Sequence, residues 1–145
     1  MAGLFHDVGK LVIAVAMPEQ YEAALVAAAV RCEPILESGP LLLQTDHAEL
    51  SALAVDYWGL GEPIRAAAAY HHEPEKSPAA PGKISLAMAV SQVDALVNAA
   101  GMSLLPATAV RAEILALAFD GFPVDQMSLV ARFAEEWTTT GAVFR

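Results

Sequence analysis

Residues 3–10 of the chain read GLFHDVGK, and they place His6 and Asp7 side by side within a largely apolar segment. Neighbouring residues on a helix point about 100° apart, so the two side chains cannot face one metal ion symmetrically. They can lie at the edge of a shared pocket, where the imidazole holds one ion and the carboxylate bridges to a second. Taken alone, the dipeptide is better explained as a local hydrogen-bonded pair on a helix surface, because short motifs often match by chance.

The two residues that follow this pair add to the pattern. Gly9 removes a side chain beside the pair, which permits close helix packing or close approach of a ligand. Lys10 lies one helical turn from the pair and could place a positive charge over a phosphate. If the chain is an enzyme, Lys10 and Asp7 are its catalytic candidates.

Further metal-capable side chains occur on three other predicted helices. His47 lies in the first turn of the third helix, His71 and His72 end the fourth, and Asp94 lies within the fifth. Imidazoles and carboxylates from facing helices form the mixed nitrogen–oxygen sites that bind transition metals. We therefore expect one or two divalent ions (iron, manganese or zinc) to be held by His6, Asp7, His47, His71, His72 and Asp94.

Asp94 is unusual because its helix is apolar nearly all round, with Val93 and Leu96 among its neighbours. A carboxylate on such a helix is costly unless it is paired or metal-bound. Alternatively, Asp94 faces solvent on a polar stripe with Ser91 and Asn98. Periodicity leaves both interpretations open.

Composition favours one helical domain spanning residues 1–145. Hydrophobic residues make up 56% of the chain, and much of this is alanine, the best helix former. Acidic residues number 17 and basic residues 8, so the net charge is −9, and no stretch supplies the basic face of a nucleic-acid binder. No apolar run approaches the roughly 20 residues that span a bilayer, so we expect no membrane segment. The single cysteine, Cys32, allows no internal disulfide and fits the cytoplasm.

Turn signals divide the chain into about seven helices, and no period-2 strand is evident. The fold class is therefore predicted to be all-α and compact, with the motifs in residues 1–101 and two further helices in 102–145. The predicted helices are Leu4–Ala16, Pro18–Glu37, Asp46–Gly59, Glu62–His72, Ile84–Ala100, Ala107–Phe119 and Val124–Trp137.

Four motifs, taken in order, resemble the HDOD domain of the HD superfamily, which is related to the HD-GYP phosphodiesterases. They are His6–Lys10, Asp46–Glu49, Trp58–Ile64 and Tyr70–Pro74. The resemblance covers Gly3 to about Gly101. It implies that the superfamily's His-Asp doublet corresponds to His6 and Asp7, its later aspartate to Asp94, its extra histidines to His47, His71 and His72, and its phosphate-binding lysine to Lys10.

Two departures from the family pattern bear on function. In the family the doublet follows helices that carry a first histidine, whereas here it begins at residue 6. We therefore expect missing N-terminal helices, an exposed apolar groove beside the first helix, and self-association through it. The segment after His72 also lacks a Gly-Tyr-Pro signature, which argues against hydrolysis of cyclic dinucleotides.

The resemblance thus favours a regulatory module that acts through another protein or domain and keeps a residual metal site. The alternative is a metal-dependent phosphohydrolase, expected to be weak or inactive in a chain without the first histidine. A third interpretation is a helical domain whose histidines meet by coincidence.

Overall fold

The computed structural model describes residues 1–31, 45–80, 82–99 and 125–141, and these form helices and turns with no strand among them. The all-α prediction is therefore confirmed. The elements are α1 (Ala2–Phe5), α2 (Val8–Ala16), α3 (Pro18–Arg31), α5 (His47–Tyr57), α6 (Glu62–Tyr70), the 3₁₀ turn η1 (Pro74–Lys76), α7 (Leu86–Ala99) and α8 (Gln126–Gly141).

The first predicted helix, Leu4–Ala16, is wrong as a single helix. It breaks at the His-Asp pair, where His6 ends α1 and Asp7 precedes α2 with φ −107° and ψ 7°. Aspartate favours this N-cap position, although the Asp7 carboxylate makes no capping hydrogen bond here. The predicted helix 107–119 and the end of the predicted helix 18–37 lie outside the described residues.

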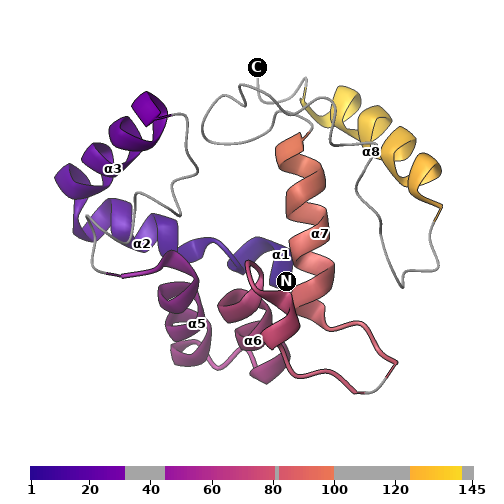
Figure 1. Ribbon diagram of the computed structural model, residues 1–145, viewed down its shortest axis with the longest axis horizontal. Helices are drawn as coiled ribbons and strands as arrows, with labels where there is room; N and C mark the ends of the chain where they lie inside the picture. Colours follow the sequence, from indigo (N-terminus) through magenta and orange to yellow (C-terminus); the bar gives the residue numbers. More distant parts are fainter. Residues whose placement is uncertain (32–44, 81, 100–124, 142–145) are drawn as a thin grey trace.

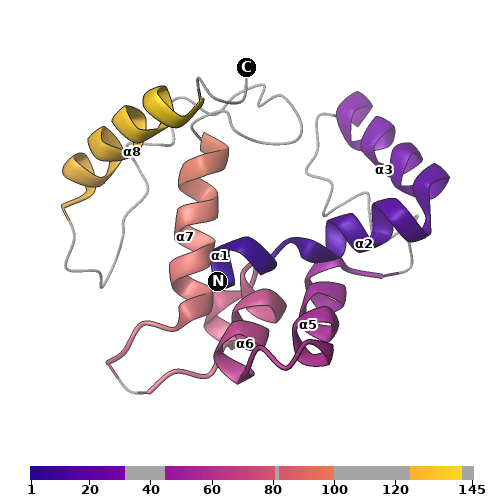
Figure 2. The same ribbon diagram turned by 180° about the vertical axis from the view of Figure 1, so that it is seen from behind.

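Helices α5 and α6 lie side by side, and the other elements are arranged around them (Figure 1). Helix α2 packs on α5, while α7 packs on α6. The short α1 contacts both α6 and α7, and the reverse view shows it next to α7 (Figure 2). Helices α3 and α8 lie at opposite ends of the molecule. The break between α1 and α2 is thus placed near α5, α6 and α7.

A tight turn lets α6 run back along α5. Gly59 and Gly61 have φ values of 65° and 89°, a left-handed conformation that glycine adopts without steric cost. Pro63 then lies in the first turn of α6, where its missing N–H costs nothing. Because the chain reverses here, the first residue of α5, His47, comes next to the end of α6.

Small residues bring the helices close together. Ala52, Val55 and Ala68 are buried between α5 and α6, with Phe5 packed against them. A Cβ added at Gly9 would overlap the carbonyl oxygen of His47, so α2 and α5 approach more closely than any side chain would permit. The close packing expected at Gly9 is therefore observed.

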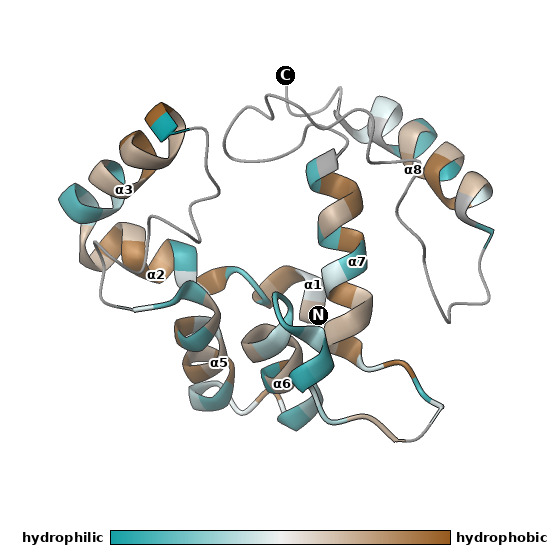
Figure 3. Cartoon of the chain, in the orientation of Figure 1, coloured by the Kyte–Doolittle hydropathy of each residue, from teal (hydrophilic) through white to brown (hydrophobic). Residues whose placement is uncertain are grey.

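Helices α2 and α7 are coloured mostly as apolar in Figure 3. Among the described residues, no single helix is both long and apolar enough to cross a membrane. Residues Ala2–Ala16 and Pro18–Arg31 meet that criterion only as a pair, by length and composition, and they are bent by 118° relative to each other.

Candidate metal centre

All six predicted ligands come together where the α1–α2 break meets α5, α6 and α7. They form two overlapping groups, and within each group the candidate ligand atoms lie within 4.8 Å of one another. Asp7 belongs to both groups, so its carboxylate lies between two candidate ion positions. The groups are Asp7, His47, His71 and His72, and His6, Asp7 and Asp94.

The Asp7 carboxylate is the hub of the cluster. Its Oδ1 lies 3.2 Å from Nε2 of His47 and 3.6 Å from Nε2 of His71. Its Oδ2 lies 2.6 Å from Nζ of Lys10 and 3.5 Å from Nε2 of His6. Burial alone would raise the pKa of Asp7, but the adjacent imidazoles of His47 and His71 and the ammonium of Lys10 outweigh burial and hold the pKa well below its usual range. The group is therefore an anion.

The buried ring of His71 is oriented by a backbone carbonyl. Its Nδ1 lies 2.8 Å from the carbonyl oxygen of Ala68, so Nδ1–H donates there, and this tautomer places the lone pair on Nε2. That lone pair faces Asp7 Oδ1, and neither atom has a hydrogen-bond partner among the described residues. Two acceptors that face each other are satisfied when a proton or a metal ion lies between them.

His6 repeats this arrangement on the other side of Asp7. Its Nδ1 lies 3.0 Å from the carbonyl oxygen of Gly3, which leaves Nε2 directed at the two carboxylates and without a hydrogen-bond partner. The Nε2 atom lies 3.7 Å from Oδ1 of Asp94. Burial lowers the pKa of His6, but the carboxylates of Asp94 and Asp7 raise it more, so the site attracts positive charge.

His47 and His72 complete the first group. Their Nε2 atoms are 3.0 Å apart, and Nδ1 of His47 lies 3.5 Å from Oδ1 of Asp46. Burial, with the neighbouring rings of His71 and His47, lowers the pKa of His72 to about 4. At neutral pH His72 is therefore an uncharged imidazole, the form in which histidine binds metals.

Asp94 faces the cluster and does not point simply to solvent. Its Oδ1 is directed at His6, while Oδ2 accepts a 2.9 Å hydrogen bond from the side-chain amide of Asn98. The adjacent imidazole of His6 lowers the pKa of Asp94 despite the partial burial of this carboxylate. The polar stripe considered from the sequence exists, because Asn98 lies next to Asp94, but it orients the carboxylate toward His6.

These donors fit a divalent transition metal. Imidazole nitrogens and carboxylate oxygens suit iron, manganese and zinc, and the backbone carbonyls of Gly3 and Ala68 orient two of the rings as outer partners of metal-bound histidines do. Among the described residues, four buried side-chain polar atoms lack a hydrogen-bond partner, and three of them are Nε2 of His6, Nε2 of His71 and Oδ1 of Asp7. All three point into the cluster, where a cation would pair with them.

Sequence reasoning missed several supporting groups. The hydroxyl of Ser51 accepts a 2.8 Å hydrogen bond from the backbone N–H of Gly9, and this bond joins α2 to α5 beneath the cluster. A serine among apolar positions was the only signal of this role. Asp46 was expected as the first residue of a predicted helix, and in the structure it caps α5 and also lies beside His47. The orienting carbonyls left no signal, since every residue has one.

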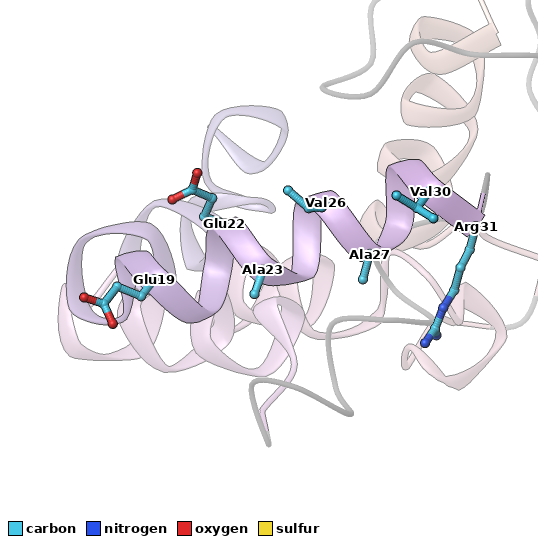
Figure 4. Close-up of a pocket in the computed structure, with 7 residues that line it drawn as sticks. All are labelled: Glu19, Glu22, Ala23, Val26, Ala27, Val30 and Arg31. Atoms are coloured by element: carbon cyan, nitrogen blue, oxygen red, sulfur yellow. The ribbon is translucent and has the colours of Figure 1, made fainter.

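Two hollows on the surface differ in their relation to the cluster. One is a cleft between α1, α2, α3 and α7, and Asp7, Lys10 and Asp94 contribute to its wall. The other runs along α3, with glutamates toward one end and Arg31 at the other (Figure 4). The α3 hollow contains no histidine among its described lining residues. Of these two hollows, the cleft is therefore the one whose described lining includes members of the cluster.

Fold and cluster together define an all-helical domain with a histidine–aspartate centre. Comparison with protein families is more specific, because the HDOD domain matches residues 1–74, just over half of the 145 residues. The chain belongs to the HDOD domain family. The matched region contains five of the six cluster residues, and Asp94 lies beyond it. Searches of curated proteins and of solved structures returned no match.

Proposed function

We propose that this HDOD domain is a cytoplasmic signalling module that binds a divalent metal ion and acts through another protein or domain. The observation that carries the metal site is the pair of oriented imidazoles, His6 and His71, whose Nε2 lone pairs face the Asp7 carboxylate. Membership of the family supports the regulatory role, since HDOD domains are regarded as output modules. Cys32, the single cysteine, supports the location.

The residues that would hold an ion belong to the two groups around Asp7. His47, His71 and His72 would offer three imidazole nitrogens beside Asp7, while His6 and Asp94 would offer a mixed pair on its other side. A bound divalent ion would supply a concentrated positive charge at this point. Around it the chain's own residues fix the ring orientations, with His47 and His71 buried and His72 exposed.

A path of contacts links the cluster to the protein surface. His6 follows Phe5, and the Phe5 ring packs on Trp58 with ring centroids 5.6 Å apart. Trp58 is 47% exposed, and on the same helical hairpin Tyr57 is 89% exposed and Leu53 59% exposed. Exposed aromatic and aliphatic side chains of this kind are frequent in protein interfaces. A metal ion bound at His6 would therefore change the position of Phe5 and Trp58, and with them a surface that could bind a partner protein.

Tryptophan fluorescence tests this coupling. The chain has two tryptophans, so a Trp137→Phe variant reports on Trp58 alone. We expect zinc to change the emission of Trp58 in a saturable way in this variant, and we expect no change when His71→Ala is added. If elemental analysis shows bound zinc but the emission of Trp58 does not change, the regulatory proposal is contradicted and the metal site is still supported.

A second candidate function is metal-dependent phosphoester hydrolysis. The observation that favours it is the position of Asp7 between both groups, because paired metal ions in hydrolases share bridging ligands. The charge of Lys10 beside Asp7 could contact a phosphate. Phosphomonoesters and phosphodiesters tested with added manganese separate the candidates. Turnover that is lost in both His6→Ala and Asp94→Ala would favour the hydrolase, and absence of turnover from metal-loaded protein would favour the module.

A further inference from the structure

The cleft beside the metal centre has the size of a small-molecule site. It encloses about 550 Å³, within the range of roughly 300–1,000 Å³ that ligand pockets occupy. Its walls come from α1, α2, α3 and α7, so segments distant in the sequence combine to form it. Such a cleft differs from a bare helix face because it is walled on several sides.

The cleft is chemically divided. Asp7, Lys10 and Asp94 contribute charged groups from the cluster, and Asn98 lies beside Asp94. The remaining lining is mostly aliphatic and comes from all four helices: Leu4, Val8, Leu11, Ala14, Leu25 and Val97. A ligand that fills this cleft must therefore be polar at one end and apolar along its body.

The charge at the polar end depends on the metal. Asp7 and Asp94 are carboxylates and Lys10 carries an ammonium group 2.6 Å from Asp7, so without an ion these three groups carry a net charge of about −1 at neutral pH. One divalent ion reverses this to about +1, taking the histidines as neutral. The metal-loaded cleft would thus attract an anion, while its aliphatic walls would exclude water from an apolar body.

We propose that the metal-loaded cleft binds an amphipathic organic anion: a phosphate or carboxylate head at the Asp7, Lys10 and Asp94 end, with an aliphatic body against Leu11, Leu25 and Val97. The proposal rests on the metal centre proposed above, because the head group needs the ion's charge. If the domain is a regulatory module, this anion is the signal that it detects. If the domain is a hydrolase, anions of this class are its substrates.

Calorimetric titration of the metal-loaded chain with small probes tests the proposal. Hexyl phosphate is compared with inorganic phosphate, and hexanoate with acetate, so the two pairs separate phosphate heads from carboxylate heads. Hexylammonium carries the same body with the opposite charge. We expect each six-carbon anion to bind at least about tenfold more tightly than its short counterpart, because apolar surface is buried. We expect no measurable binding of hexylammonium.

Two exposed residues of α2 provide a matched pair of variants. Leu11 is 67% exposed and lines the cleft, whereas Val15, one turn further on, is 84% exposed and does not line it. Leu11→Asp should weaken binding of hexyl phosphate about tenfold and weaken binding of inorganic phosphate less, because inorganic phosphate has no aliphatic body to contact this side chain. Val15→Asp should leave both unchanged. Neither side chain belongs to the buried core, so both variants should fold, and circular dichroism checks this.

Metal content measured on the same samples separates the two proposals. If the ion is present but hexyl phosphate binds no better than inorganic phosphate, the cleft proposal is wrong and the metal centre stands. Equal effects of Leu11→Asp and Val15→Asp, or tighter binding of hexylammonium than of the anions, would also overturn it. If no ion binds at all, the metal centre fails first and the cleft proposal fails with it.

Discussion

One hydrogen bond gives the buried imidazole of His71 its role. The Ala68 carbonyl fixes the proton on Nδ1. The Nε2 atom is then a hydrogen-bond acceptor, and it faces Asp7. The sequence predicts that His71 and Asp7 are metal-capable, because their side chains have the chemistry. It could not predict which ring nitrogen faces the cluster, since that depends on a backbone carbonyl placed by the end of α6. The sequence thus predicts which residues are candidate ligands, but it does not predict how their side chains are oriented.

Gly9 provides a test at the scale of one atom. A Cβ there would meet the His47 carbonyl and the backbone of Ser51. Gly9→Ala should therefore force α2 away from α5 and lower the free energy of unfolding by about 1–3 kcal/mol or more, as overpacked sites do. Denaturant unfolding measures this. Gly3→Ala is the control, because a Cβ at Gly3 meets nothing within 4 Å. Equal effects of the two substitutions would contradict the packing argument.

Helix periodicity predicts most of the described elements but not their interruptions. The helices predicted to start at Asp46 and Glu62 correspond to α5 and α6, since capping and proline signals are local. The break at His6 and Asp7 was missed, because every residue from Leu4 to Ala16 is compatible with one helix. The break is stabilised by contacts of Asp7 with α5 and α6. Tertiary contacts of this kind have no local signature.

The start of α5 links helix capping to the cluster. The Asp46 side chain accepts a 2.9 Å hydrogen bond from the backbone N–H of Ala48 and lies beside His47. Asp46→Ala should lower the free energy of unfolding by about 1 kcal/mol. It should also weaken metal binding about 10–100-fold, as loss of an outer partner of a ligand does. Asp125→Ala is the control, since Asp125 caps α8 through Ser128. That variant should keep full metal affinity.

At the scale of the whole molecule, the cluster depends on the α1–α2 break meeting α5, α6 and α7. Sequence order alone gives the ligand types and their helices, but the distance between His6 and Asp94 follows from how α1 and α7 both pack on α6. The resemblance supplied that arrangement as an expectation, and the structure brings the two side chains to 3.7 Å. Spacing in the sequence carries no information of this kind.

The exposed apolar surface predicts self-association. Val15 on α2 and Val26 and Val30 on α3 are all exposed, and the α3 pair projects from the helix in Figure 4. Contiguous exposed apolar groups favour association with a second copy. We expect sedimentation velocity to show a dimer at high micromolar concentration, and a combined Val26→Glu and Val30→Glu variant to stay monomeric. A wild-type chain that is monomeric throughout this range would contradict the expectation.

The central claim is that six side chains form a metal centre, and chelation tests it most directly. A ligand that binds only the folded state adds about 2.7 kcal/mol at a hundredfold excess over its dissociation constant. For a chain of this size this corresponds to about 5–10 °C in melting temperature. We expect purified protein to contain stoichiometric iron, manganese or zinc, to lose this stability with a chelator, and to regain it when the ion is restored. His71→Ala should lack the response, while Glu49→Gln, an exposed carboxylate of α5 outside the cluster, should keep it. Protein without metal whose melting temperature is unchanged by chelator or added ion would contradict the account.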